Sequence, residues 1–437
     1  MKQLLAYCLS IILCVSFTGC MENYLDLYPE DKITSASFPE NESDIKLLLN
    51  GVYAQLREKE VYNQGLFGFG ITDGATPNAF NWGTDEVFNK LGAGRLSSSD
   101  GGVVTYRWKR CYEIISRANY LLACMDLVDL SEEAKAKYSG ETHFLRGLAY
   151  SVLAETYGGV PIILTNISTE EARSLKRASL EETWQQALDD YEVAITNLGV
   201  DAPEPGRATK GAALGMKMRA YLYQGKYKEV LSCVEQIDAL KKYGLFHSYE
   251  GLFDPANENN KEVLFDIQYI EGENSQGSYI DQYCGTGTGS WTRGSRYVPT
   301  DDLVAAYETI DGSPVDPENP YENRDPRLGF TAVLPGSYFL GYRFPNYLYP
   351  GGAFNHAGNR LKHLSTRKYR IQDESKLPPS GQSYINDIIL RYADVLLSKA
   401  EAIIETNGNV ADAIAILNRI RTERDDVKIS LLPTSMS

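Results

Sequence analysis

Apolar residues recur at helical spacing through most of the first 245 residues and again after residue 384, which predicts a mainly α fold. The clearest stripe lies in residues 43–59 and consists of Ile45, Leu48, Leu49, Val52 and Leu56. Similar patterns predict helices over residues 106–122, 131–157 and 180–198. Gly158 and Pro161 provide stop signals, and Ser179 with Glu182 forms a capping box.

Two further stretches predict helices joined in pairs. One pair begins at residue 210 and turns at residues 224–226, and the other begins at residue 391 and turns at residues 407–409. Small residues such as Ala212 and Gly215 allow close packing, which is typical of tetratricopeptide-type pairs. Residues 131–198 are a candidate third pair. Generic antiparallel hairpins remain the alternative, because the full repeat signature is not met.

Residues 250–383 differ in kind, since they are rich in Gly, Pro, Asn and Tyr. The short apolar run at residues 263–267 predicts a strand within this stretch. A structureless loop of this length is unusual in a compact domain. We therefore expect a loop-rich ligand-binding part, about residues 60–105 and 250–383, on a helical scaffold, about 43–245 and 384–424.

The N-terminus resembles a bacterial lipoprotein signal. Lys2 is followed by an apolar run over residues 4–17 and by Thr18-Gly19-Cys20. We expect residues 1–19 to be a removed signal peptide, Cys20 to carry the lipid, and residues 20–437 to form a single domain anchored by acyl chains. An ordinary secretory signal that ends near a cysteine is the alternative.

Composition excludes several classes of function. The net charge of −15 argues against nucleic acid, whose phosphates are neutralised by Lys and Arg. Cys8 and Cys14 would leave with the signal, and no CxxC pair occurs among Cys111, Cys124, Cys233 and Cys284. We therefore expect no zinc or other cofactor and no disulfide framework; the first three of these four cysteines fit a helical core.

No catalytic constellation is evident in the sequence. The four histidines form no HExxH motif, and His143 fits a core position. The acidic pairs Asp301-Asp302 and Asp425-Asp426 mean little among 58 acidic residues. The Gly-rich run at residues 285–290 lacks the lysine of a phosphate-binding loop. We expect a binding protein without catalysis.

The excess of aromatic residues suggests where a ligand would bind. The chain has 30 tyrosines, and rings in loops can pack against the apolar face of a sugar. We expect the site to form from residues 72–95 and 276–297. The candidates are Phe80, Asn81, Trp82, Tyr279, Tyr283, Trp291, Arg293, Arg296 and Tyr297. For Trp82 and Trp291, packing is an equal alternative, whereas Trp108 and Trp184 lie in helical patterns and fit the core.

Several strings occur in an order that resembles one family, the RagB/SusD outer-membrane lipoproteins. They include YLDLYPEDKIT at residues 24–34, FLRGLAYSVLAETYGGVPII at 144–163, RKYRI at 367–371 and DIILRYADVLLSKAEAIIETNG at 387–408. Most have structural interpretations: Asp325 and Arg327 can pair across a turn, and Arg391 fits a buried pairing with Glu401 further along.

This resemblance implies a cell-surface protein that captures oligosaccharides, or in some branches peptides, and delivers them to a SusC-like TonB-dependent β-barrel transporter. It transfers one residue role directly, lipidation of Cys20. The family's usual C-terminal helices are missing after residue 424, so we expect uncovered apolar faces within residues 395–417. A helical-repeat lipoprotein that binds peptides or a protein partner is the alternative function.

Overall fold

The computed structural model describes most of the chain. The described residues are 38–57, 73–81, 90–97, 99–271, 277–278, 297–340, 342–343, 364–371, 373–378 and 382–433. Helices dominate, and the strands are short. The mainly α fold predicted from the sequence is confirmed. No helix in these ranges is long and apolar enough to cross a membrane.

The first group of helices confirms the predicted stripes. It comprises α2 (Glu42–Arg57), α5 (Val103–Cys124), α6 (Glu132–Tyr157), α7 (Thr169–Ser174) and α8 (Leu180–Asn197), with η2 (Met125–Leu127) after α5. Ser179 and Glu182 form the predicted capping box at the start of α8. Trp184 is buried, and Trp108 packs partly buried against the same core. Cys111, Cys124 and Cys233 are buried and free, as expected.

Both predicted helical pairs are present. The helix α9 (Lys210–Tyr223) turns into α10 (Tyr227–Ala239), and α14 (Tyr392–Glu405) turns into α15 (Val410–Thr422). α14 packs on α10, while α6 packs extensively on α8. Gly215 lets α9 approach β8 closely, because a Cβ there would lie 2.2 Å from a methyl carbon of Leu390 and would displace that side chain.

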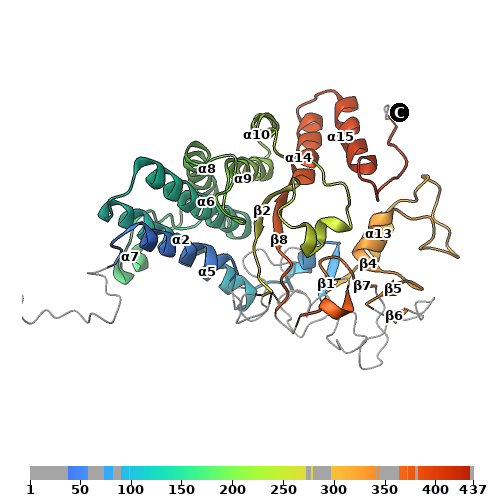
Figure 1. The fold of residues 1–437 in the computed structure, drawn as a ribbon, viewed down its shortest axis with the longest axis horizontal. Coiled ribbons are helices and arrows are strands. Elements are labelled where there is room, and N and C mark those ends of the chain that lie inside the picture. Colours follow the sequence, from blue (N-terminus) through green and yellow to red (C-terminus); the bar gives the residue numbers. More distant parts are fainter. Residues whose placement is uncertain are drawn as a thin grey trace, which may run out of the picture.

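The loop-rich part lies beyond the central strands β2 and β8, on the side away from α2, α5, α6 and α8 (Figure 1). The described strands form two-stranded antiparallel pairs: β1 with β3, β2 with β8, β4 with β7 and β5 with β6. The strands are β1 (Ala79–Asn81), β2 (Val263–Ile267), β3 (Tyr297–Pro299), β4 (Ala332–Val333), β5 (Tyr338–Phe339), β6 (Tyr342–Arg343), β7 (Ser365–Thr366) and β8 (Asp387–Arg391). The helices are η1 (Asp73–Ala75), η3 (Gly251–Phe253), η4 (Pro255–Asn257), α12 (Asp301–Ala306), α13 (Pro326–Thr331) and η5 (Glu374–Lys376). β2 matches the predicted strand.

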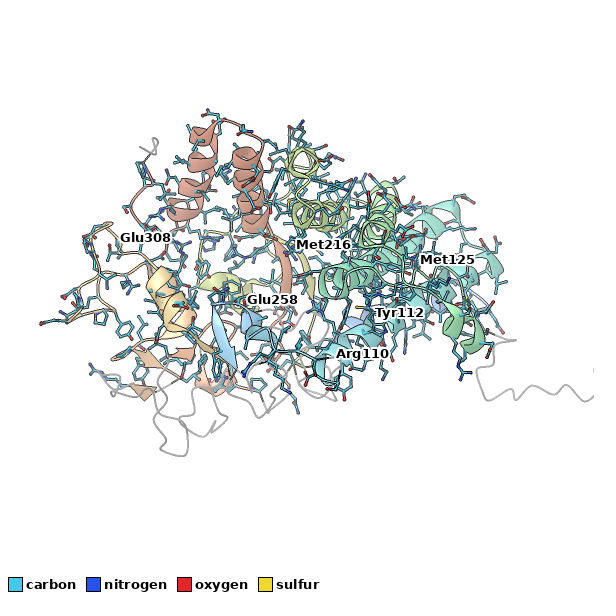
Figure 2. All side chains as sticks on the ribbon, turned by 180° about the vertical axis from the view of Figure 1, so that it is seen from behind. Arg110, Tyr112, Met125, Met216, Glu258 and Glu308 are labelled. Carbon is cyan, nitrogen blue, oxygen red and sulfur yellow. The ribbon has the colours of Figure 1, made fainter. Side chains whose placement is uncertain are left out.

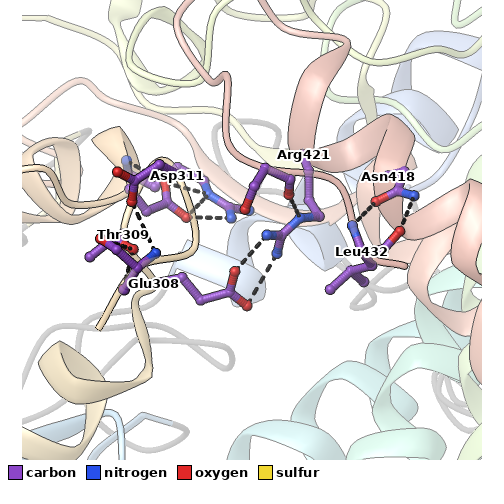
Figure 3. Close-up of polar contacts among 10 residues, drawn as sticks. Glu308, Thr309, Asp311, Asn418, Arg421 and Leu432 are labelled. Carbon is purple, nitrogen blue, oxygen red and sulfur yellow. Dashed lines mark hydrogen bonds and ion pairs between the residues drawn. The ribbon is translucent and has the colours of Figure 1, made fainter. Parts of the chain in front are cut away.

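Residues after α15 fold back between that helix and the loop-rich part (Figure 3). Arg421 forms an ion pair of 2.5 Å with Glu308 and donates to the carbonyl of Ser430. Asn418 exchanges hydrogen bonds with the backbone of Leu432, at 2.8 and 3.2 Å. These contacts tie α15 to the segment that leads into α13.

The apolar faces of α14 and α15 are partly covered. Val395 and Ile414 are buried, whereas Leu397, Ile404 and Val410 are 46%, 45% and 42% exposed. The expected uncovered surface is therefore confirmed for one face of these helices and wrong for the other.

The carboxylate of Glu262 joins the scaffold to the loop-rich part. Its side chain is fully buried and accepts hydrogen bonds from Arg424 at 2.7 Å, Arg391 at 2.9 Å and the backbone N–H of Phe246 at 2.7 Å. Burial alone would raise the pKa of Glu262, but Arg424 and Arg391 together lower it. The buried pairing expected for Arg391 exists, but its partner is Glu262, because Arg391 ends β8 and lies opposite β2.

A second group of acidic residues lies in or near the β2–β8 pair, and their pKa values are raised where that of Glu262 is lowered. Burial raises the pKa of Asp266 to about 6 and the pKa values of Asp387 and Glu258 to about 7. Asp266 accepts from the Asn386 amide and Asp387 from the Tyr269 hydroxyl, so neutral donors are their partners. Glu258 lies near the middle of the molecule (Figure 2).

We predict that Glu262→Gln lowers the free energy of unfolding by about 3–5 kcal/mol, because it leaves Arg424 buried without a counter-charge. Urea unfolding followed by circular dichroism measures the change. Glu401→Gln on the exposed side of α14 is the control and should change stability by less than about 0.5 kcal/mol. Equal stability of the two variants would contradict the role given to Glu262.

We also predict that stability falls as the pH rises from about 4 to 7. The folded-state pKa values of Asp266, Asp387 and Glu258 lie above their ordinary values. Their contribution is therefore complete below about pH 4 and is lost as the pH rises through 6 to 7. Asp387→Asn should flatten this decline by an amount on the order of 2 kcal/mol. Unfolding curves across this pH range, with the exposed Asp129→Asn as control, measure it; an unchanged slope in Asp387→Asn would refute the assignment.

Candidate functional site

The two segments predicted to form the ligand site meet in space. β1 comes from the first segment and pairs antiparallel with β3, which begins at the end of the second. Phe80 lies opposite Val298, and Asn81 lies opposite Tyr297. The backbone N–H of Thr300 extends the pairing by donating to the carbonyl of Asn78 at 3.1 Å. Residues more than 200 positions apart are thus held side by side.

The structure describes the predicted site residues only in part. The Phe80 ring is 43% exposed, whereas its neighbour Val298 is fully buried. Asn81 and Tyr297 are described through their backbone in β1 and β3. The remaining predicted residues, like the lipidation site, lie outside the described residues: Cys20, Trp82, Tyr279, Tyr283, Trp291, Arg293 and Arg296. Ligand contact by this set stays a prediction.

A cavity of about 180 Å³ lies next to the β1–β3 pair. Ala79 and Pro299, which face each other in the strand register, both line it. The lining also includes Asp73, Asn78, Tyr249, Leu303, Tyr307, Thr331, Thr366, Lys368 and Tyr369. The cavity therefore adjoins the place where the two predicted segments meet.

Several backbone contacts place the charged and aromatic lining of this cavity. The N–H groups of Arg367 and Lys368 both donate to the carbonyl of Thr331, at 2.8 and 3.2 Å. Tyr369 follows with a φ of 58°, a conformation that is uncommon for a residue with a side chain. Asp73, another lining residue, begins the η1 turn, and its carbonyl accepts a hydrogen bond from the Thr76 hydroxyl.

Tyr249 is positioned from the far end of the chain. Its backbone N–H donates to the carboxylate of Asp426 at 2.8 Å, and the same carboxylate accepts from Ser248 and from the N–H of Glu250. Asp426 thus orders a turn of the loop-rich part. Its neighbour Asp425 receives no such set of donors in the described residues. Of this acidic pair, Asp426 is therefore the member with a structural role.

Sequence reasoning missed most residues that line the cavity. Tyr249, Tyr307 and Asp73 lie in separate segments with no shared motif. Lys368 and Tyr369 belong to the RKYRI string, which marked only a family resemblance. The one available signal was the general excess of tyrosine, which does not identify individual positions.

The titratable groups of the cavity are shaped by burial. Burial raises the pKa of Asp73, and the charge of Lys368 partly opposes this rise. Burial also raises the pKa of Tyr307 to about 12, and its hydroxyl pairs with that of Thr331 at 3.0 Å. Both phenol and carboxyl can therefore serve as hydrogen-bonding groups at neutral pH.

The polar groups considered for catalysis have structural partners where they are described. His143 pairs with Asp190 at 2.7 Å, and Asp190 also binds Arg146. Asp301 and Asp302 occupy the first turn of α12, where negative charge favours the helix end. Asp325 caps α13 and pairs with Arg327 at 2.5 Å, as expected. Within the described ranges, no group of three His, Cys, Asp or Glu side chains could hold a metal ion.

Two family models match the chain. The model of the SusD family matches residues 261–424. A second model, described as "Starch-binding associating with outer membrane", matches residues 23–222. Together these matches cover the helical scaffold apart from α10, the β2–β8 pair and the cavity lining from Pro299 to Tyr369.

Individual relatives agree with these models. The chain is 26% identical to a SusD-like protein, P25, of Formosa agariphila, over 96% of this chain and 81% of that protein. A crystal structure of a SusD-like carbohydrate-binding protein of Bacteroides fragilis is 26% identical, with a TM-score of 0.79 over 90% of this chain and 80% of that one. Surface glycan-binding protein A of Bacteroides fluxus, at 20% identity, shares the fold with a TM-score of 0.69 over 91% of this chain and 84% of that one.

Proposed function

The chain belongs to the SusD family, and on that basis we propose that it captures oligosaccharides at the cell surface and delivers them to a TonB-dependent β-barrel transporter of the outer membrane. Carbohydrate binding is supported by the starch-binding description of one family model and by the carbohydrate-binding relative of Bacteroides fragilis. Delivery to the transporter rests on the family resemblance. The proposed role is binding without catalysis.

The proposed location of the site rests on one structural observation: β1 and β3 join the two aromatic segments. Pairing through the backbone brings Phe80 of one segment to the strand that begins at Tyr297 of the other. Rings placed on a shared edge suit a sugar, whose apolar face stacks on them while its hydroxyls bind amide and guanidinium groups.

We propose that the ligand is held by residues on both sides of this junction. Phe80, Asn81 and Trp82 would act from the first segment, and Tyr297 would act from the strand end of the second. The remaining contacts would come from Tyr279, Tyr283, Trp291, Arg293 and Arg296. The cavity beside Ala79 and Pro299 extends the same site inward.

We further propose that Cys20 carries a lipid anchor after removal of residues 1–19, and that residues 20–437 act as one domain. The association with the outer membrane is supported by the description of the family model that matches residues 23–222. The matched region begins at residue 23, three residues after Cys20.

We predict that Trp82→Ala and Trp291→Ala each weaken binding of a confirmed oligosaccharide ligand by about 1–3 kcal/mol, through loss of ring stacking. Calorimetric titration against an oligosaccharide panel measures the effect. Tyr223→Ala is the control, because this exposed aromatic residue ends α9, outside both segments. If both tryptophan variants stay folded and bind as tightly as the parent protein, the ligand lies elsewhere.

We predict that Cys20→Ser moves the protein from the membrane fraction to the soluble fraction, because the acyl acceptor is lost. Cell fractionation with immunoblotting measures the distribution. Cys14→Ser is a matched control, since this cysteine lies within the proposed signal and should leave membrane attachment unchanged. Membrane attachment that survives in Cys20→Ser would refute the lipid anchor.

A further inference from the structure

The cavity beside the β1–β3 pair contains an unusual cation. The Lys368 ammonium lies 4.3 Å from the centre of the Phe253 ring, 5.3 Å from that of Tyr369 and 5.7 Å from that of Tyr249. Its side chain is half-buried and lines the cavity together with Tyr249 and Tyr369. Aromatic faces attract a cation but supply no hydrogen-bond acceptor of ordinary strength.

Three arginines of this region each pair with a carboxylate, whereas Lys368 pairs with none of the described carboxylates. Arg367 pairs with Glu250 at 2.5 Å, Arg327 with Asp325 at 2.5 Å, and Arg391 with Glu262 at 2.9 Å. In the described part of the chain, no carboxylate lies within ion-pair distance of the Lys368 ammonium, and no acceptor receives its hydrogens. The charge of Lys368 acts to lower the pKa of Asp73, but the two side chains form no ion pair.

Positively charged side chains act on Tyr249, one of the residues that line the cavity. Burial alone would raise the pKa of Tyr249, yet the charges of Lys368 and Arg391, with a hydrogen bond from Thr331 and the charge of Arg327, lower it. Positive charge therefore outweighs desolvation at this phenol. This local field contrasts with the net charge of −15 of the whole chain.

The size of the cavity limits what can enter. Pockets for drug-sized ligands enclose about 300–1,000 Å³. A volume of about 180 Å³ has room for one sugar ring or one substituent, with the rest of a glycan outside on the β1–β3 side.

We infer that this cavity is a charge-selecting subsite, in which the Lys368 ammonium binds a carboxylate or sulfate group carried by a glycan. The inference rests on the proposed oligosaccharide binding and specifies its substrate class as acidic glycans. The three rings hold the ammonium in place without neutralising it, and an anionic group of the ligand supplies the missing acceptor. Asp73, which also lines the cavity, accepts a hydroxyl of the same sugar.

Small sugars test the cavity separately from the oligosaccharide site. The probes are methyl glucuronide, glucose 6-sulfate and, as the neutral reference, methyl glucoside, each titrated at millimolar concentrations into the mature protein in detergent. We expect at least one of the two anions to bind about tenfold or more tightly than the neutral sugar, as a charge-assisted hydrogen bond would provide. The two anionic probes distinguish a carboxylate-selecting subsite from a sulfate-selecting one.

Three variants assign the preference to Lys368. Lys368→Met should remove the preference for the anion while leaving the weak binding of methyl glucoside unchanged, and Lys368→Arg should retain it. Lys176→Met removes an equal charge from an exposed position before α8 and should behave as the parent protein. Thermal unfolding of each variant shows that it is folded.

The outcomes separate this inference from the proposed function. Equal binding of anionic and neutral sugars, or a preference that persists in Lys368→Met, overturns the charge-selecting subsite. Oligosaccharide binding that depends on Trp82 and Trp291 would then still stand. Conversely, a Lys368-dependent preference for an anion supports the subsite even where the tryptophan variants place the oligosaccharide elsewhere.

Discussion

The buried carboxylate of Glu262 is the constraint on which the rest of the architecture depends. A carboxylate and a guanidinium removed from water are stable only when each has its partners, and the desolvation cost of an unpaired charge is several kcal/mol. Glu262 finds its partners in Arg391 at the end of β8, in Arg424 after α15 and in the backbone of Phe246. Four separate stretches of the chain therefore meet at this carboxylate, which ties the scaffold to the loop-rich part.

The loop-rich part extends from this junction. β8 fixes Leu390 against Gly215 of α9, and on the other side a second core forms from Leu252, Phe253, Tyr369, Ile371 and Ile385. Ala79 of β1 packs against that second core, which therefore supports the β1–β3 pair.

The sequence predicted the helices well because their signals are local. Periodicity placed α2, α6 and both helical pairs, and the Ser179–Glu182 box placed the start of α8. It also led us to expect that residues 72–95 and 276–297 share a site; the structure joins their described parts through β1 and β3, and ligand contact stays a prediction. It could not identify the partner of Arg391, which lies 129 residues away in Glu262, nor group Lys368 with Tyr249 and Asp73. Such pairings depend on register between distant strands, and the periodicity of a single strand carries no information about its partner.

The chain as a whole is acidic, yet a charged lysine, Lys368, lines the cavity. This contrast follows from the aromatic rings that contact its ammonium group. A carboxylate partner would fix the ammonium but cancel its field, whereas Phe253, Tyr369 and Tyr249 fix it through ring quadrupoles that leave most of the charge in place. The overall charge of −15 acts on a ligand mainly at long range, where salt screens it within about 10 Å. Inside a partly desolvated cavity the nearest charge dominates. A surface that is acidic, and therefore well solvated, is thus compatible with a site that selects an anionic group, because the two act over different distances.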